Sequence, residues 1–352
     1  MASPTEQLLP GQALLRLIGT AKLQDRAERR RAAAAADRII ELSGDRQRAA
    51  ADVTAALLER HEQARCANGG VCRLGGFHQL LAVAALVAFR WRLDDTPLVC
   101  RLLTAVAGCE STLERLLAGA IFGPCVTYLV SGSKADLSDR AECLRFAEYL
   151  LRHAVAADLR ITVNTLPCGR RGWDRSYRAI DLPLLSYESL PPLHAAVAQC
   201  RPDAVLALLR LGARLSFLPL GAPLWSDSRH SPMEHLCHRL NSEVESHVLT
   251  GRPYSSEVVL CLRLLLRAAP PTALRLISGL GEEGTEWRGA ALHYTVVAQE
   301  GGLAQYAGVP PLRHMTRCVL RRRLAELGRL PGGLRHLPLP QPLRNYLDLA
   351  ED

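Results

Sequence analysis

The sequence is almost without lysine. Lys22 and Lys134 are the two lysines among its 43 basic residues, so 41 are arginine, and the formal net charge is +8. A positive balance of this size is compatible with nucleic-acid binding. The arginines are scattered, however, and no aromatic ladder for base stacking lies between them. Nucleic-acid binding is therefore the minor alternative, and a nucleotide-composition bias that also favours Ala, Gly and Pro is the simplest explanation of the missing lysine.

Aromatic residues and long apolar runs are also scarce. Aromatics make up 5% of a chain that is 48% hydrophobic, which excludes wholesale disorder. Ala and Leu dominate and strand-favouring residues are few, so the composition predicts an all-α fold. The longest apolar run, residues 80–89, is about half a membrane span, and "MASPTEQLLP" has no basic flank before an apolar core. We expect neither a membrane segment nor a signal peptide.

Paired cysteine motifs are absent. The eleven cysteines are scattered singly without a Cys-x-x-Cys pair, which favours free thiols and an intracellular location in the cytoplasm or the nucleus. The nearest approach to a metal site is a group whose spacings match no zinc pattern: His61, Cys66, Cys72 and His78. For a second group, helix-start and surface roles are expected: His230, His235, Cys237 and His238. The sequence predicts no metal and no cofactor.

The chain divides into three expected segments: an N-terminal helical segment (1–70), a helical middle (71–305) and a C-terminal module (306–352). In the first segment, apolar residues recur at helical spacing on both sides of a break at residues 43–45. Asp45 is placed to cap the second helix. The glycine-rich stretch "ANGGVCRLGG", residues 67–76, then separates this segment from the next.

The middle segment contains one well-formed repeat-like stretch, "LPPLHAAVAQCRPDAVLALLRLGARLSF", residues 190–217. It resembles an ankyrin repeat, whose two short helices the matching residues would form: Pro192, Leu193, His194 and Ala196, then Val205, Leu208, Leu209, Gly212 and Ala213. A proline suits the first helical position and a glycine suits a left-handed cap. His194 is expected to be structural, with hydrogen bonds to neighbouring turns.

Weaker copies flank this stretch. One begins at Thr96 and closes at Gly119 and Ala120, and others are 139–161, a unit from Ser231 completed by 258–270, and 289–302. Since a lone repeat cannot bury a core, we expect a degenerate ankyrin-repeat solenoid with a protein-binding concave face. No catalytic motif is found, and the glycine-rich loop 278–286 lacks the lysine of a phosphate site. The protein is therefore not expected to be an enzyme.

The C-terminal module begins with "VPPLRHMTRCVLRRRLAELG", residues 309–328. Pro310 and Pro311 start a helix in which one face is apolar, while Arg313, Arg317 and Arg321 are turned elsewhere; the apolar positions are Leu312, Met315, Val319 and Leu320. The proline-broken "LPLPQPLRNYLDL" closes the chain. An apolar stripe on a module too small to stand alone implies a partner.

These residues resemble a SOCS box, placed where the ankyrin-repeat and SOCS-box family carries it. The resemblance implies elongin C binding by Leu312, Met315, Thr316, Val319 and Leu320, with Leu312 as the anchor. It implies that a Leu-Pro-aliphatic-Pro sequence selects cullin 5: Leu337, Pro338, Leu339 and Pro340. "PLRNYLDL" resembles the family's Leu-x-x-Tyr-Leu ending. The implied partners are elongin C, elongin B, cullin 5 and its RING subunit, together with a protein substrate on the repeats.

Thr316 departs from the family pattern, which has cysteine there. A helical threonine can bond its hydroxyl to the carbonyl four residues earlier, which limits the cost of burying it. The added polar group is expected to weaken elongin binding by about 1 kcal/mol. The sequence thus predicts a non-catalytic substrate receptor of a ubiquitin ligase, and the alternative is an ankyrin scaffold without a ligase role.

Overall fold

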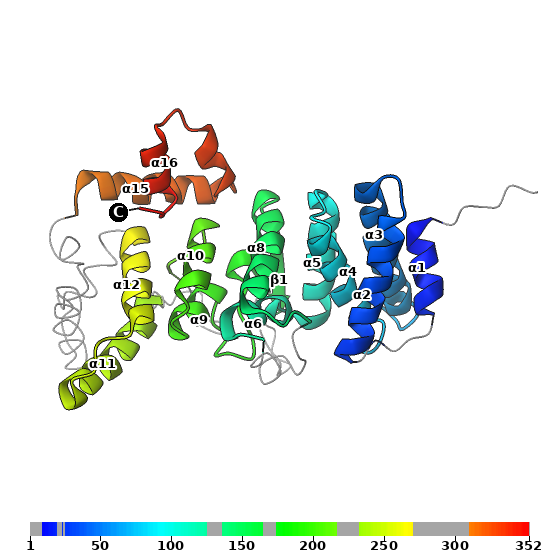
Figure 1. The fold of residues 1–352 in the computed structure, drawn as a ribbon, viewed down its shortest axis with the longest axis horizontal. Helices are drawn as coiled ribbons and strands as arrows, with labels where there is room; N and C mark the ends of the chain where they lie inside the picture. The colour runs from blue at the N-terminus through cyan, green and yellow to red at the C-terminus, as the bar shows by residue number, and fades with distance from the viewer. Residues whose placement is uncertain are drawn as a thin grey trace, which may run out of the picture. The chain divides into compact units, whose positions relative to one another are not determined.

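The computed structural model describes residues 9–19, 23, 25–124, 136–164, 174–216, 232–269 and 310–351 (Figure 1). The chain forms two compact units, Met1–Asn164 and Thr165–Asp352. These units reflect packing alone, and the expected segments 1–70, 71–305 and 306–352 stay a prediction.

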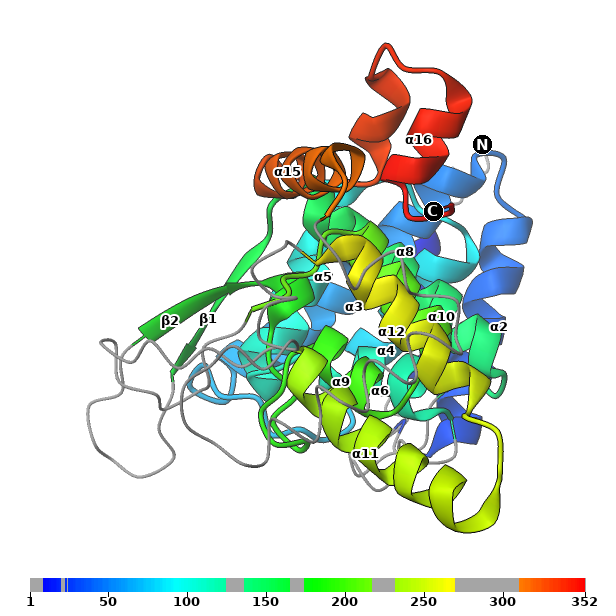
Figure 2. The same cartoon turned by 90° about the vertical axis from the view of Figure 1, so that its left-hand side faces the viewer.

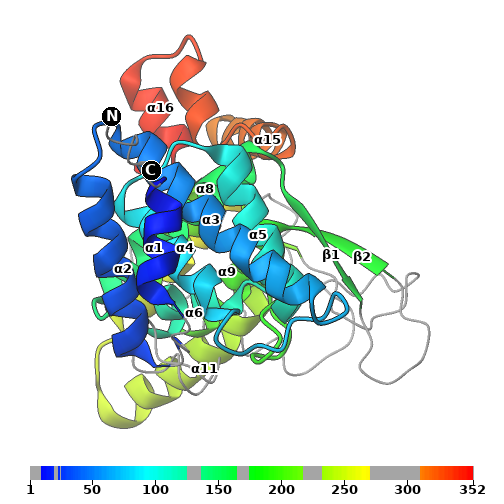
Figure 3. The same cartoon turned by 90° about the vertical axis from the view of Figure 1, so that its right-hand side faces the viewer.

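The first unit is built mainly of helices that pack side by side, as Figure 3 shows for α1 to α5. Its elements are α1 (Pro10–Ile18), α2 (Arg26–Glu41), α3 (Arg46–Cys66), α4 (Gln79–Arg90), α5 (Thr96–Glu110), α6 (Glu114–Phe122), α8 (Arg140–Ala156) and β1 (Arg160–Asn164). Aspartate side chains start several of these helices. Asp45 accepts a hydrogen bond from the Arg48 backbone N–H at 3.0 Å, so its predicted capping role is confirmed.

Helix α4 forms the centre of this unit. Residues 80–89, the longest apolar run in the sequence, are all buried, and α4 packs against α2, α3, α5 and α8. A helix that is apolar on every side needs neighbours all round, which explains its central position. Among the described residues, no helix is both long and apolar enough to cross a membrane.

The second unit contains β2 (Asp174–Arg178), the 3₁₀ helix η1 (Ala179–Asp181), α9 (Pro192–Ala198), α10 (Pro202–Arg210), α11 (Pro232–Thr250), α12 (Ser256–Ala268), α15 (Leu312–Glu326), the 3₁₀ helix η3 (Gly332–His336) and α16 (Gln341–Leu347). Helices α9 to α12 pack against one another. Figure 2 shows α15 lying across the end of α12, with η3 and α16 beyond it.

The pair α9 and α10 forms as the repeat-like stretch predicts. Helix α9 begins at Pro192, and Gly212 adopts the left-handed conformation after α10, with φ +83°. The other motif residues on these helices are buried: Leu193, His194, Ala196, Val205, Leu208 and Leu209. The helix pair is confirmed, whereas its membership of an ankyrin solenoid stays a prediction. The stretches 278–286 and 289–302 and the side chains of His230, Cys237 and His238 lie outside the described residues.

The described residues are mostly helical, so the helical fold that the composition predicts is confirmed, but two local features differ from expectation. The all-α expectation missed β1 and β2. In β1 the β-branched Ile161 and Val163 are buried and Thr162 between them is exposed, an alternation that stabilises a strand. The repeat copy expected to close at Gly119 and Ala120 also does not end there. Both residues lie inside α6, which continues to Phe122 because its surrounding residues are apolar and buried.

Candidate functional site

Helix α15 carries the candidate site, and the prolines before it fix where it begins. Pro311 has extended backbone angles, φ −60° and ψ 148°, so the helix begins at Leu312. Gly328 follows the helix with φ +64°, a conformation that suits a C-terminal stop. These two signals set the two ends of α15.

One face of α15 is polar and buried. Arg317 is 1% exposed and Arg321 is 6% exposed. Arg321 donates through Nη1 to the Leu347 carbonyl at 2.6 Å and through Nη2 to the Leu209 carbonyl. Their helical positions predict that these arginines lie off the apolar stripe, and in the structure Arg321 contacts α10 and α16 while Arg317 lies over the Tyr346 ring of α16. They fasten α15 to the unit.

Burial sets the charges on this inner face. It lowers the pKa of the Arg321 guanidinium to about 10, so the group is still a cation at neutral pH. Burial, followed by repulsion from Arg317, lowers the pKa of His314, which keeps the imidazole neutral. His314 Nε2 lies 3.0 Å from the Ala269 carbonyl oxygen and therefore donates to it. Most polar groups of the inner face therefore have partners within the unit; Arg317 Nε is a buried nitrogen without one among the described residues.

The opposite face of α15 is apolar and bare. Leu312 is 79% exposed, and Met315 and Val319 are exposed on the same side at helical spacing. Thr316 shares this face, and its hydroxyl donates to the Leu312 carbonyl at 2.9 Å, the local bond that its helical position predicts. We call these four residues, Leu312, Met315, Thr316 and Val319, the outer stripe.

Leu320 does not belong to the outer stripe. It is half-buried and packs, with Leu324, against a small cluster whose buried members are Leu330, Leu334 and Leu347. This cluster lies between α15, η3 and α16 and gives the C-terminal module its own core. Leu320 was predicted as a partner-binding residue, and in the structure it faces that core.

The Leu-Pro-Leu-Pro segment connects η3 to α16. Leu337 and Leu339 are half-buried against the leucine cluster, while Pro338 and Pro340 are exposed. Alternation of this kind is what an extended backbone produces. The segment therefore presents its prolines to solvent while its leucines anchor it.

Gly212 sets how closely α15 approaches α10. A Cβ atom built there would lie 2.9 Å from the Ala325 Cβ and 3.3 Å from Leu330 Cδ1. We expect Gly212→Ala to destabilise the protein by about 1–3 kcal/mol, from strain at positive φ and overpacking. Thermal melting would show a drop of several degrees. Gly251→Ala is the matched control, since φ there is +68° and no atom lies within 4 Å. Equal losses in both variants would exclude a role for the helix contact.

A second group of reactive side chains lies in the first unit. One ligand atom from each of four residues falls within 4.8 Å of the others: His61, Cys72, His78 and Cys109. Cys109 was not in the group expected from sequence, and Cys66, which was, is exposed outside it. Burial raises the pKa of the Cys109 thiol to about 12, and burial followed by His78 lowers the pKa of His61. Sequence spacing gave no signal for Cys109.

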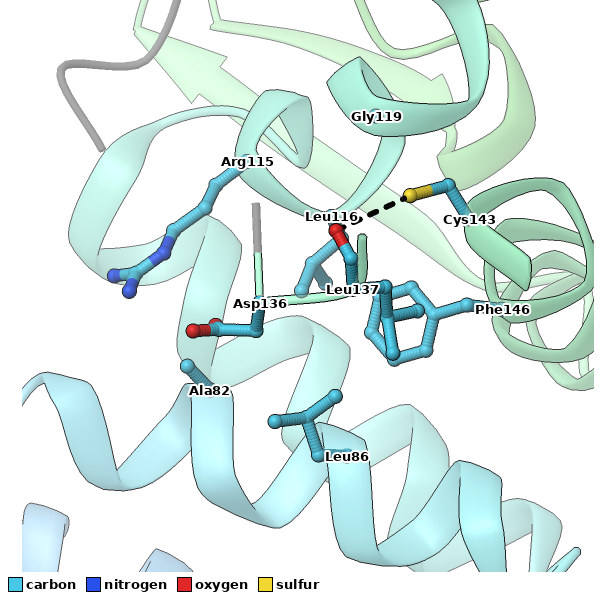
Figure 4. A pocket seen from close by; sticks show the side chains of 9 residues that line it. All are labelled: Ala82, Leu86, Arg115, Leu116, Gly119, Asp136, Leu137, Cys143 and Phe146. Carbon is cyan, nitrogen blue, oxygen red and sulfur yellow. Dashed lines mark hydrogen bonds between the residues drawn. The ribbon is translucent and has the colours of Figure 1, made fainter. Parts of the chain in front are cut away.

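A small cavity lies between α4, α6 and α8 (Figure 4). Its walls are mostly apolar side chains such as Leu86 and Phe146, with Arg115 and Asp136 at one edge. The volume is about 40 Å³. That is room for a water molecule and not for a larger ligand.

Comparison with family models identifies the C-terminal module. Residues 308–348 match the SOCS box. Comparison with curated proteins gives no match, and comparison with solved structures gives none. The chain therefore carries a SOCS box, a module that typically binds elongins B and C and a cullin in a ubiquitin ligase. The resemblance drawn from the last forty residues is confirmed, and the ankyrin resemblance stays a prediction.

Proposed function

We propose that this SOCS-box protein is the substrate-recognition subunit of an elongin B/C–cullin 5–RING ubiquitin ligase. The observation that carries the proposal is the bare outer stripe on a helix whose other face is fully occupied. Leu312 is 79% exposed at the start of α15. Apolar side chains gathered on one face of a rigid helix are typical of a helix that inserts into a partner's groove.

The parts of the chain would then have separate roles. The outer stripe would enter a pocket of elongin C, with elongin B bound to elongin C, and the exposed Pro338 and Pro340 would meet cullin 5. The helix pairs, as a degenerate ankyrin solenoid inside the cell, would hold a protein substrate. The protein would be a receptor and not an enzyme. It would bring an amine of the substrate close to the activated ubiquitin that the RING subunit of the ligase recruits. With Lys22 and Lys134 as its two lysines, it would offer few sites for its own modification.

The test is binding of the full chain to purified elongin B/C. We expect a stable ternary complex in size-exclusion chromatography and calorimetry. The competing function, an ankyrin scaffold without a ligase role, predicts no complex, because the Thr316 hydroxyl would then have ended adaptor binding. Failure of the wild-type chain to bind elongin B/C would replace the ligase proposal with the scaffold.

Cullin binding has its own prediction. Replacing both Pro338 and Pro340 with alanine should leave elongin B/C binding unchanged and weaken cullin 5 binding by the elongin-bound chain at least about tenfold, or 1.4 kcal/mol. The reason is that the two prolines are exposed, while the leucines that anchor the segment remain. Surface-plasmon resonance on immobilised cullin 5 measures it. Pro342→Ala, exposed at the start of α16, is the control, and equal cullin affinity in all three proteins would contradict the assignment.

A further inference from the structure

The loop of residues 67–78 in the first unit is fastened by polar side chains instead of apolar ones. It connects α3 to α4 without regular structure, and its large apolar side chains, Val71, Leu74 and Phe77, are all exposed. Hydrophobic burial therefore does not hold it in place. The side chains that do turn inward are Cys72 and His78, and both belong to the four-residue cluster.

The geometry points to a zinc site: we propose that His61, Cys72, His78 and Cys109 bind one Zn²⁺ ion. Cys109 Sγ lies 3.4 Å from His61 Nε2, and Cys72 Sγ lies 3.6 Å from His78 Nδ1. In a tetrahedral site with Zn–S of about 2.3 Å and Zn–N of about 2.0–2.1 Å, sulfur and nitrogen ligands are about 3.6 Å apart. Both pairs already have this separation, and the four atoms lie within 4.8 Å of one another.

The surroundings of the two histidines fit metal ligation. His78 Nε2 lies 2.6 Å from Glu110 Oε1, and Arg115 lies 3.8 Å from the same oxygen. When a histidine binds a metal through one ring nitrogen, a carboxylate commonly accepts a hydrogen bond from the other ring nitrogen. This bond fixes the orientation of the ring and its tautomer. His61 is 2% exposed, and its Nδ1 has no hydrogen-bond partner among the described residues. Hydrogen bonding alone therefore does not account for burying this ring.

The donor set selects the ion. Two thiolates and two imidazoles in a tetrahedral arrangement suit Zn²⁺. The two thiolate charges neutralise the charge of the ion, which lowers the electrostatic cost of burying the site. All four positions are filled by protein ligands, which is typical of a structural and not a catalytic zinc. His61, Cys72 and His78 also line an open hollow at the surface, which gives the ion a path of entry. The bound ion would join α3, the 67–78 loop, α4 and α5.

Metal analysis of the full-length protein tests the proposal. Protein from zinc-supplemented cells, purified with a non-chelating reductant, should contain one zinc per chain by mass spectrometry. Cys109→Ala should lose at least about nine-tenths of that zinc. Cys66→Ala is the matched control, since Cys66 is an exposed thiol at the end of α3 outside the cluster, and it should keep a full equivalent. Absence of zinc from the wild type, or equal zinc in Cys109→Ala and the wild type, would overturn the site.

Two further measurements use folded wild-type protein, in case a ligand variant does not fold. Cobalt-reconstituted wild type should show the intense visible bands of a tetrahedral Co²⁺ ion and thiolate charge-transfer bands. A weak octahedral spectrum would overturn the proposal. A chelator should lower the melting temperature of the wild type and of Cys66→Ala by several degrees. A disulfide between Cys72 and Cys109 in freshly isolated protein would also overturn it, because the thiolates would not be available.

Discussion

Leu312→Asp is expected to abolish elongin B/C binding while the protein stays folded. Leu312 is 79% exposed, so an aspartate there meets water in the free protein and costs little stability. In a complex, the carboxylate would enter an apolar pocket without a partner, which costs several kcal/mol. We expect affinity to fall at least about 100-fold, equivalent to about 3 kcal/mol. Isothermal titration calorimetry with purified elongin B/C measures the change.

Leu249→Asp is the matched control for this experiment. Leu249 is 82% exposed near the end of α11, away from the outer stripe, and the substitution introduces the same charge into the same unit. It should bind elongin B/C like the wild type, and both variants should melt at the wild-type temperature. Wild-type affinity in Leu312→Asp would show that the outer stripe is not the binding surface. An equal loss in Leu249→Asp would show that added charge alone is responsible.

Helix boundaries could be predicted from the sequence because the signals are local. Asp45 caps α3 and the proline pair before Leu312 starts α15, and in both places the residue type acts on its own backbone. The outer stripe could be predicted for the same reason, since i, i+3 and i+7 spacing places side chains on one face in any helix. These are properties of a few consecutive residues.

Features that depend on distant segments could not be predicted in this way. The apolar pattern of α15 groups Leu320 with the outer stripe, and only the position of η3 and α16 shows that it packs on Leu334 and Leu347. In the first unit, Cys109 belongs to the four-residue cluster because α5 packs beside α3. The spacing of residues along the sequence does not show this packing. The strand β1 was missed because its alternation of buried and exposed side chains spans five residues. The composition of the whole chain favours helix, and so short a pattern does not change that prediction.

Arginines on three helices, α10, α12 and α15, illustrate the same limit, and their hydrogen bonds explain why lysine would not replace them. Backbone carbonyls of the last residues in the chain accept from several arginines: Arg210 to Asp348, Arg267 to Leu349, and Arg317 to Glu351. A guanidinium has five N–H donors in a planar fork and can bridge two elements. The ammonium group of a lysine carries all its donors on one nitrogen atom and lacks this fork geometry. The sequence identifies the arginines, but it does not show which backbone carbonyls accept from them, because those carbonyls belong to residues far along the chain.

Arg321→Met is expected to have the largest effect on stability. Arg321 bridges the Leu209 carbonyl in the last turn of α10 and the Leu347 carbonyl at the end of α16, where the helix dipole favours a cation. The Leu209 carbonyl also accepts from the Gly212 backbone N–H at 2.9 Å. Methionine keeps much of the volume and removes the donors. Leaving these carbonyls without the guanidinium should destabilise the protein by about 2–4 kcal/mol. Denaturant unfolding of the full chain measures it.

Arg322→Met is the control for this variant, because Arg322 is the next residue on α15 and is exposed. It should unfold like the wild type. Hydrogen exchange should further show that Arg321→Met loses protection in α16 and at the end of α10, the two places where its donors are missing. If Arg321→Met and Arg322→Met unfolded alike, the inner face would not fasten the module. The contrast with Leu312→Asp is then direct: on one helix, a change on the inner face should cost stability, and a change on the outer stripe should cost binding alone.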